Sequence, residues 1–132
     1  MTAKLIDGKQ IAAEIRSEVK VAVSARQEQG LPVPGLATVL VGDDPASKVY
    51  VRNKQKACAE VGIASFGYNL PAEASQQEVE SLVSQLNADP TINGILVQLP
   101  LPRHLNDEAV LSAIDLNKDV DGFHPVNIGK LA

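Results

Sequence analysis

The stretch that decides the fold of this chain is residues 36–61, LATVLVGDDPASKVYVRNKQKACAEV. Its opening run, LATVLV, is apolar on both faces, which is typical of a strand in the interior of a sheet. The turn-rich residues 42–45 (GDDP) follow, and a helix is predicted over Ser47–Val61, ending before Gly62. A buried strand that leads directly into a helix predicts the first unit of a parallel α/β sheet.

Two more elements are predicted on either side of this unit. A first helix begins after Asp7, with Gln10 at the reciprocal position of a capping box, and ends at Gly30. The apolar positions that we expect to face the core on this helix are Ile11, Ile15, Val19 and Ala22. A strand over Ser65–Leu70 alternates polar and apolar residues, which suits a place near the edge of the sheet.

The second half of the chain continues the alternation of helix and strand. Ser75 and Glu78 form a capping box for a helix that Pro90 ends. The apolar positions of that helix are Val79, Leu82, Val83 and Leu86. Residues 94–99 (GILVQL) are the most strand-like stretch of the chain, and Pro100 stops them.

A short helix over Asp107–Ile114 completes the set of elements, with Val110 and Leu111 among its apolar residues. The resulting order is helix, strand, helix, strand, helix, strand, helix. Parallel strands joined by helical crossovers accommodate this order. The fold class that we predict is therefore α/β, a three-layer sandwich with a mostly parallel sheet.

Composition limits what the chain can be. Its 132 residues suffice for one domain, and 45% hydrophobic with 21% charged residues indicates a globular protein. A net charge of −4 offers no electrostatic case for binding nucleic acid. No apolar run is long enough to span a membrane, and the N-terminus has no signal-peptide core. Cys58, the single cysteine, is expected in the core, and a lone thiol suggests a cytoplasmic location.

Lys54 occupies a helix face that is otherwise suited to the interior. At about 100° per residue, one stripe of the 47–61 helix comprises Tyr50, Lys54, Ala57, Cys58 and Val61, with Ser47 at its leading edge. A partly apolar site destabilises the ammonium form of a lysine and favours proton transfer. Lysines also lie along apolar surface while their ammonium group reaches water, so this helix alone leaves both interpretations open.

Two other side chains are expected at the same end of the sheet as Lys54. Ligands of open parallel sheets bind beyond the carboxyl ends of the strands. Gln98 lies near the end of the apolar strand, and Asp121 lies in a loop that follows the last helix. A buried amide can simply satisfy backbone groups, and an aspartate beside Gly122 can simply form a turn. Taken together, an amine, an amide, a phenol and a carboxylate indicate a site for acid–base chemistry on a flat ligand.

Other kinds of site do not fit the sequence. His104 and His124 lack a helix-spaced partner, so we expect no metal site. The aspartates do not match a calcium-binding loop. The chain contains neither GxGxxG nor a Walker A motif, which disfavours an unrelated nucleotide-binding protein.

Three blocks make the chain resemble a known family. They are residues 41–63 (VGDDPASKVYVRNKQKACAEVGI), 94–102 (GILVQLPLP) and 118–131 (KDVDGFHPVNIGKL). In this order they are similar to the N-terminal catalytic domain of bifunctional methylenetetrahydrofolate dehydrogenase/methenyltetrahydrofolate cyclohydrolases. The resemblance implies NADP-dependent oxidation of 5,10-methylenetetrahydrofolate to 5,10-methenyltetrahydrofolate. It also implies hydrolysis of that product to 10-formyltetrahydrofolate.

The resemblance also implies roles for individual residues. Lys54 matches the family's catalytic lysine, and Gln98 matches the glutamine that hydrogen-bonds this lysine and tunes it. Tyr50 matches the tyrosine that packs on the folate rings, and Asp121 matches the aspartate that binds the pterin. Ser47 matches a nearby serine, which the resemblance places among the substrate-binding residues.

Family members carry a second, Rossmann-type domain that binds NADP. The resemblance therefore implies that residues 1–132 are a folate-binding catalytic domain, and that the NADP domain expected downstream is absent from this chain. It further implies a homodimer for the full-length enzyme. The alternative is a folate-binding module without turnover.

Overall fold

The computed structural model describes residues 7–122 and residue 129. Its elements, in chain order, are α1 Gly8–Glu28, β1 Gly35–Val41, α2 Pro45–Val61, β2 Ala64–Leu70, α3 Gln76–Ala88, β3 Gly94–Val97 and α4 Asp107–Ala113. All three strands run parallel in the order β2-β1-β3. The predicted α/β class and the parallel sheet are confirmed.

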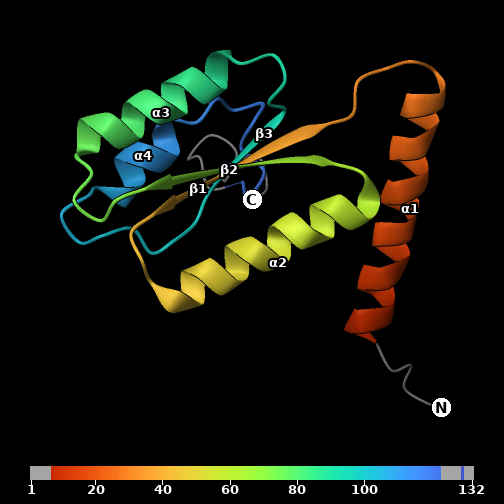
Figure 1. Cartoon of the computed structure of the whole chain (residues 1–132), viewed down its shortest axis with the longest axis horizontal. Helices are drawn as coiled ribbons and strands as arrows, with labels where there is room; N and C mark the ends of the chain where they lie inside the picture. The colour runs from red at the N-terminus through yellow and green to blue at the C-terminus, as the bar shows by residue number, and fades with distance from the viewer. Residues whose placement is uncertain (1–6, 123–128, 130–132) are drawn as a thin grey trace.

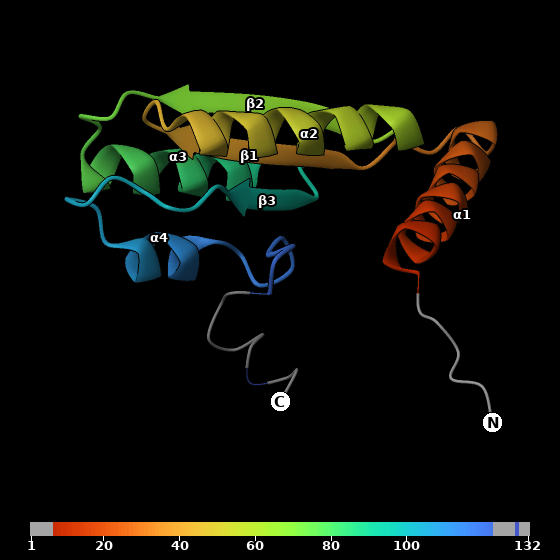
Figure 2. The ribbon, with the colours of Figure 1, turned by 90° about the horizontal axis from the view of Figure 1, so that it is seen from below.

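The helices cover both faces of this sheet (Figure 1). The crossover from β1 to β2 contains α2, and the crossover from β2 back to β3 contains α3, so right-handed connections place these helices on opposite faces. The main core lies on the side of α3 and α4, where Val39 and Ile95 from the sheet meet Val83 and Val110. Seen from below, α2 lies in front of the sheet, and the strands follow one another in the order β2, β1, β3 (Figure 2).

Local signals account for both ends of α2. The Asp44 carboxylate accepts a hydrogen bond from the Ser47 backbone N–H at 3.1 Å, and Pro45 opens the helix. At the other end, Gly62 has a φ of 87°, a left-handed conformation that glycine adopts readily. The helix therefore begins two residues before the predicted Ser47 and ends where predicted, at Val61.

The first helix differs from the prediction in its burial. Ile11 and Ile15 are 45% and 53% exposed, and Val23 is the buried residue of α1. The helix packs against α2 and otherwise projects away from the sheet (Figures 1 and 2). Asp7 caps α1 as predicted, but the Gln10 side chain bonds Glu14 instead of completing the capping box.

The segment that follows α4 adds a short parallel pairing to the sheet beside β3. Asp119 forms a parallel bridge with Ile95 of β3, and the Ile95 N–H donates to the Lys118 carbonyl at 2.7 Å. The loop predicted around Asp121 therefore begins as a strand-like pairing. β3 itself ends at Val97, two residues short of the prediction, although the Gln98 N–H still bonds the carbonyl of Val39.

Candidate functional site

Lys54 and Gln98 meet at the carboxyl end of the sheet. Lys54 Nζ donates to Gln98 Oε1 at 2.9 Å, and Gln98 Nε2 donates to the Leu99 carbonyl at 3.1 Å. An ammonium group only donates and a carbonyl only accepts, so these neighbours determine which way the amide points. Gln98 is 8% exposed. Its amide therefore holds the lysine in place through an oriented, buried acceptor.

The Lys54 ammonium keeps hydrogen-bonding capacity for a ligand. The group carries three N–H donors, and among the described residues only Gln98 accepts one of them. Lys54 is half-buried, on the α2 face that turns toward the sheet. The arrangement leaves a positioned amine with donors directed away from its amide partner.

Asp121 lies close enough to Lys54 for their charges to interact. Removal from water raises the pKa of the Asp121 carboxyl, although the residue as a whole is exposed. The positive charge of Lys54 lowers this pKa, and the negative charge of Asp119 raises it. The structure thus brings together the amine, the amide and the carboxylate that the sequence placed at one end of the sheet.

Tyr50 lies at the edge of this group, with its side chain in solvent. The residue is 56% exposed, so its predicted place within the buried stripe of α2 is wrong. The buried residues of this helix are Ser47, Val51, Cys58 and Val61. The stripe is centred on the side of Val51, which places Tyr50 on the flank one turn before Lys54.

Ser47 is enclosed by its own helix end. It is 1% exposed, and its hydroxyl donates to Asp44 Oδ2 at 2.8 Å. The same carboxylate oxygen accepts the Ser47 backbone N–H. The structure gives this residue a capping contact, which the spacing of Asp44 and Ser47 could have revealed in the sequence. Its part in substrate binding stays a prediction.

Lys118 was not singled out from the sequence, and the structure gives it a distinct environment. Its Nζ donates to the carbonyls of Leu86, Asn87 and Asp89 at 3.1, 2.7 and 3.0 Å. These carbonyls lie at the end of α3, about 30 positions earlier in the chain. No local sequence signal reports a contact across that separation.

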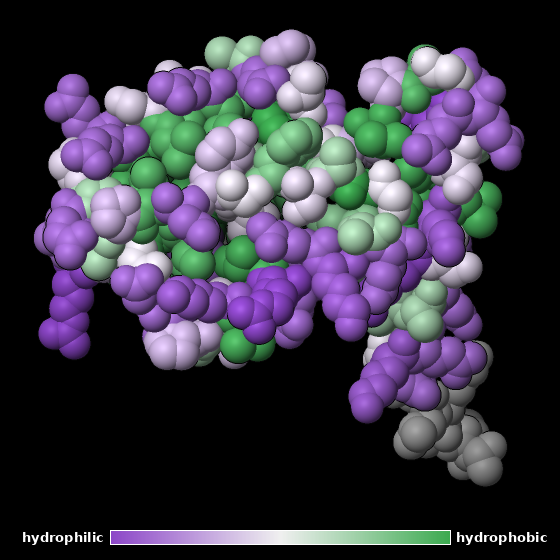
Figure 3. Space-filling view, in the orientation of Figure 1, coloured by the Kyte–Doolittle hydropathy of each residue, from purple (hydrophilic) through white to green (hydrophobic). Residues whose placement is uncertain are grey.

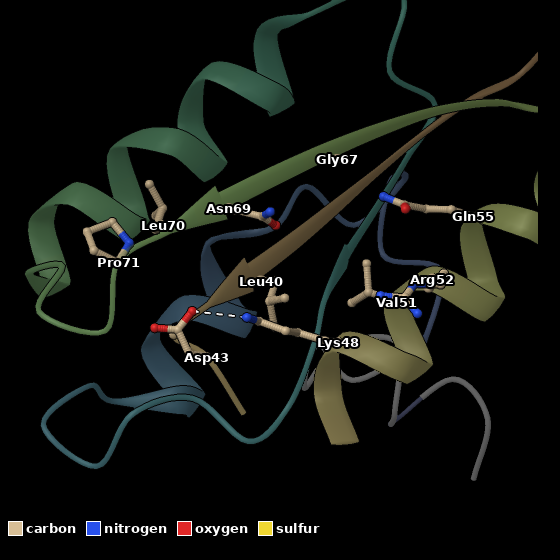
Figure 4. A pocket seen from close by; sticks show the side chains of 11 residues that line it. Leu40, Asp43, Lys48, Val51, Arg52, Gln55, Gly67, Asn69, Leu70 and Pro71 are labelled. Carbon is tan, nitrogen blue, oxygen red and sulfur yellow. Dashed lines mark ion pairs between the residues drawn. The ribbon is translucent and has the colours of Figure 1, made fainter. Parts of the chain in front are cut away.

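The outer side of α2 is hydrophilic and flanks a separate pocket. Figure 3 shows a band of hydrophilic residues over this helix. A pocket of about 630 Å³ opens between α2 and β2 (Figure 4). Its polar lining includes Lys48, which pairs with Asp43 at 3.2 Å, together with Arg52 and Asn69. Lys54 and Gln98 are not among its lining residues, so the pocket lies on the other flank of α2 from the candidate site.

Residues 7–122 and 129 contain neither a cluster of metal-binding side chains nor a membrane-spanning helix. Within these residues, no three His, Cys, Asp or Glu side chains gather as ligands for a metal ion. The Nε2 atom of the His104 ring lies 2.8 Å from the carbonyl of Ala74. His124 lies outside the described residues. Of the block 118–131, the structure describes residues 118–122 and residue 129. In the same part of the chain, none of the helices combines the length and apolarity needed to cross a bilayer.

The sequence also matches a family model over residues 6–121, described as tetrahydrofolate dehydrogenase/cyclohydrolase, catalytic domain. This match covers most of the chain and includes Tyr50, Lys54, Gln98 and Asp121. The chain belongs to the tetrahydrofolate dehydrogenase/cyclohydrolase family.

Members of this family with known sequence or structure agree closely with the chain. Bifunctional protein FolD of Desulfovibrio desulfuricans is 59% identical over 128 residues, which cover 97% of this chain and 45% of the relative. The crystal structure of the bifunctional enzyme FolD from Campylobacter jejuni superposes with a TM-score of 0.93 at 46% identity, covering 97% of this chain and 45% of that one.

A more distant member adds a bound cofactor. The Trypanosoma brucei dehydrogenase-cyclohydrolase, solved with NADP and an inhibitor, has a TM-score of 0.90 at 39% identity and is covered over 45% of its length. That match takes in 99% of this chain. The chain therefore spans about half the length of the relatives that it matches.

Proposed function

We propose that this chain is the folate-binding catalytic domain of an NADP-dependent methylenetetrahydrofolate dehydrogenase and methenyltetrahydrofolate cyclohydrolase. The observation that carries the proposal is the 2.9 Å hydrogen bond from Lys54 to Gln98, at the carboxyl end of a parallel sheet and near Asp121. The family match supports the substrate class.

In the hydrolytic step, Lys54 is the group that moves protons. A water molecule attacks the methenyl carbon that joins N5 and N10 of the folate, and the lysine amine accepts a proton from this water. The resulting ammonium gives its proton to N5 as the bond from N5 to the former methenyl carbon breaks. The hydroxyl left on that carbon then gives its proton to the freed lysine amine and becomes the carbonyl of the formyl group on N10. Gln98 Oε1 orients the amine for these transfers through its hydrogen bond.

Asp121 and Tyr50 bind the substrate in this proposal. A carboxylate accepts hydrogen bonds only, so Asp121 suits the amino and ring N–H groups of the pterin. The exposed ring of Tyr50 offers a flat surface one helical turn from Lys54, on which an aromatic part of the folate can stack. Ser47 contributes by holding the first turn of α2 through Asp44.

The oxidation step requires NADP, which accepts the hydride. The Trypanosoma brucei relative was solved with this cofactor. The 132 residues contain no dinucleotide fingerprint, so we assign none of them to NADP. We propose instead that a Rossmann-type domain, within the length that the relatives have beyond this match, binds NADP. A homodimer and a cytoplasmic location belong to the same proposal.

A folate-binding module without turnover is the second candidate. The exposure of Tyr50, Ile11 and Ile15 favours this alternative. Among the described residues, no other element buries Tyr50 at the candidate site or the apolar residues of α1. The loss of absorbance of the methenyl cation, followed with and without the chain, separates the two functions. Acceleration that disappears in Lys54→Met supports catalysis. Binding of a folate analogue without acceleration supports the module.

A further inference from the structure

The Lys118 side chain is saturated by backbone carbonyls at the end of α3. Its three ammonium donors meet the three carbonyls of Leu86, Asn87 and Asp89, all within 3.1 Å. The last carbonyls of a helix lack intrahelical partners and lie at the negative end of the helix dipole. A cation with this many charge-assisted bonds is held in one place.

The main chain of Lys118 is anchored as firmly as its side chain. Its carbonyl accepts a hydrogen bond from the Ile95 N–H of β3 at 2.7 Å, and its own N–H donates to the backbone carbonyl of Asp115 at 2.8 Å. The next residue, Asp119, forms the parallel bridge with Ile95. Lys118 therefore joins the end of α3, the first half of β3 and the segment that leads to Asp121.

The residue between this anchor and Asp121 also contacts the sheet, although Val120 is 51% exposed. Val120 packs over Gly94, where an added Cβ would approach Val120 Cγ1 to 2.5 Å. Gly94 therefore allows the segment to lie directly against the start of β3. Because Asp119 and Val120 are both held against this strand, the path of the backbone into Asp121 follows from the anchor at Lys118.

We infer that Lys118 is a positioning residue for Asp121: by tying the 118–120 segment to the end of α3, it keeps the Asp121 carboxylate near enough to Lys54 for their charges to interact. The inference rests on the proposed function of Asp121 as a folate ligand. Lys118 itself does not touch the reacting atoms, because its three donors are occupied by carbonyls. It acts through the loop that it holds.

A purely structural role for Lys118 predicts different effects of its loss. If the lysine only caps α3, its loss lowers the free energy of unfolding and leaves Asp121 unchanged. Ser75→Ala is the matched control, because Ser75 caps the opposite end of the same helix through the Glu78 N–H. Lys118→Arg keeps the charge and tests whether another cation can make the contacts.

The first experiment follows the Asp121 carboxyl by NMR in isotope-labelled chain as the pH is varied. In the parent, burial and Asp119 raise the pKa of this carboxyl. In Lys118→Met we expect the pKa of the Asp121 carboxyl to fall toward the ordinary aspartate value, because the carboxyl becomes more exposed to water once the segment is no longer held. Ser75→Ala should match the parent. A folded Lys118→Met with the parent's Asp121 titration overturns the inference. Should Lys118→Met not fold, Lys118→Gln takes its place under the same criterion.

The second experiment measures the Kd for 5-formyltetrahydrofolate, a stable folate, by calorimetry. Lys118→Met should weaken binding roughly tenfold, and in an Asp121→Ala background it should add less than about twofold, because both changes act on one contact. Full additivity of the two changes contradicts positioning through Asp121. If Asp121→Ala leaves the Kd unchanged, or the parent does not bind, the proposed function fails for Asp121, and the NMR titration alone decides the role of Lys118.

Discussion

Two half-buried lysines, Lys54 and Lys118, lie toward opposite ends of β3 and differ in how their ammonium groups are satisfied. Lys54 has one hydrogen-bond acceptor among the described residues, the side-chain amide of Gln98. Lys118 has three, all of them backbone carbonyls. An amine with unoccupied N–H donors can bind a ligand and exchange protons with it. An amine whose three donors are all occupied by backbone carbonyls stabilises the fold instead. The number of occupied donors therefore separates the two lysines better than burial does.

The largest expected effect is on catalysis. In a chimera of this chain with the remaining length of the Desulfovibrio desulfuricans relative, Lys54→Met should lower the cyclohydrolase rate by roughly 10²- to 10⁴-fold, as for a lost general acid–base group. Lys56→Met, which removes an exposed charge two residues further along α2, is the matched control and should leave the rate within about twofold of the parent. Near-parent hydrolysis by a folded Lys54→Met chimera would refute the assignment.

The same two lysines should rank in the opposite order for stability. Lys118→Met removes three charge-assisted hydrogen bonds, so the free energy of unfolding should fall by about 2–4 kcal/mol. Lys54→Met should cost less than about 1 kcal/mol, since it removes one bond at a half-open site. Urea denaturation of the 132-residue chain measures both values. Equal losses would remove the distinction drawn between the two lysines.

The pairing of Lys54 with Gln98 predicts coupled effects. Lys54→Met and Gln98→Leu should be non-additive in the free energy of activation by about 1 kcal/mol or more, because each change removes the same hydrogen bond. Lys118→Arg combined with Gln98→Leu should be additive within about 0.5 kcal/mol. A double-mutant cycle on the hydrolysis rate gives these values, and a coupling of zero between Lys54 and Gln98 contradicts the pair.

The smallest expected effect concerns the pH dependence of stability at Asp121. A carboxyl whose pKa is raised by folding binds its proton more tightly in the native state, so its contribution to stability is lost as pH rises through the folded pKa. Asp121→Asn should therefore make the chain more stable near neutral pH, and this gain should vanish as pH falls to the ordinary carboxyl range.

Asp89 provides the opposite case for that measurement. The side-chain and backbone hydrogen bonds from Thr91 lower the pKa of Asp89, so its carboxylate favours the folded state above the ordinary pKa. Asp89→Asn should lose stability at neutral pH and converge with the parent as pH falls. Urea midpoints between pH 3 and pH 7 test both variants, and shifts of the same sign would contradict the contrast.

The positions that sequence reasoning placed well depend on local or repetitive rules. Asp7 and Ser75 cap helices because a side-chain oxygen needs to reach only two or three residues ahead. Lys54 and Gln98 were expected at one end of the sheet because parallel strands all point the same way, and the hydrogen bond between them agrees with that expectation.

The sequence by itself determined the order of the elements, the parallel sheet and the residues at its carboxyl end, because periodicity and capping act over one or two helical turns. Only the tertiary structure decided that Ile11 and Ile15 remain exposed, since their burial depends on what α1 packs against. It likewise decided that Lys118 binds the end of α3. That contact joins residues far apart in the chain, and only the packing of α3, β3 and the last segment brings them together.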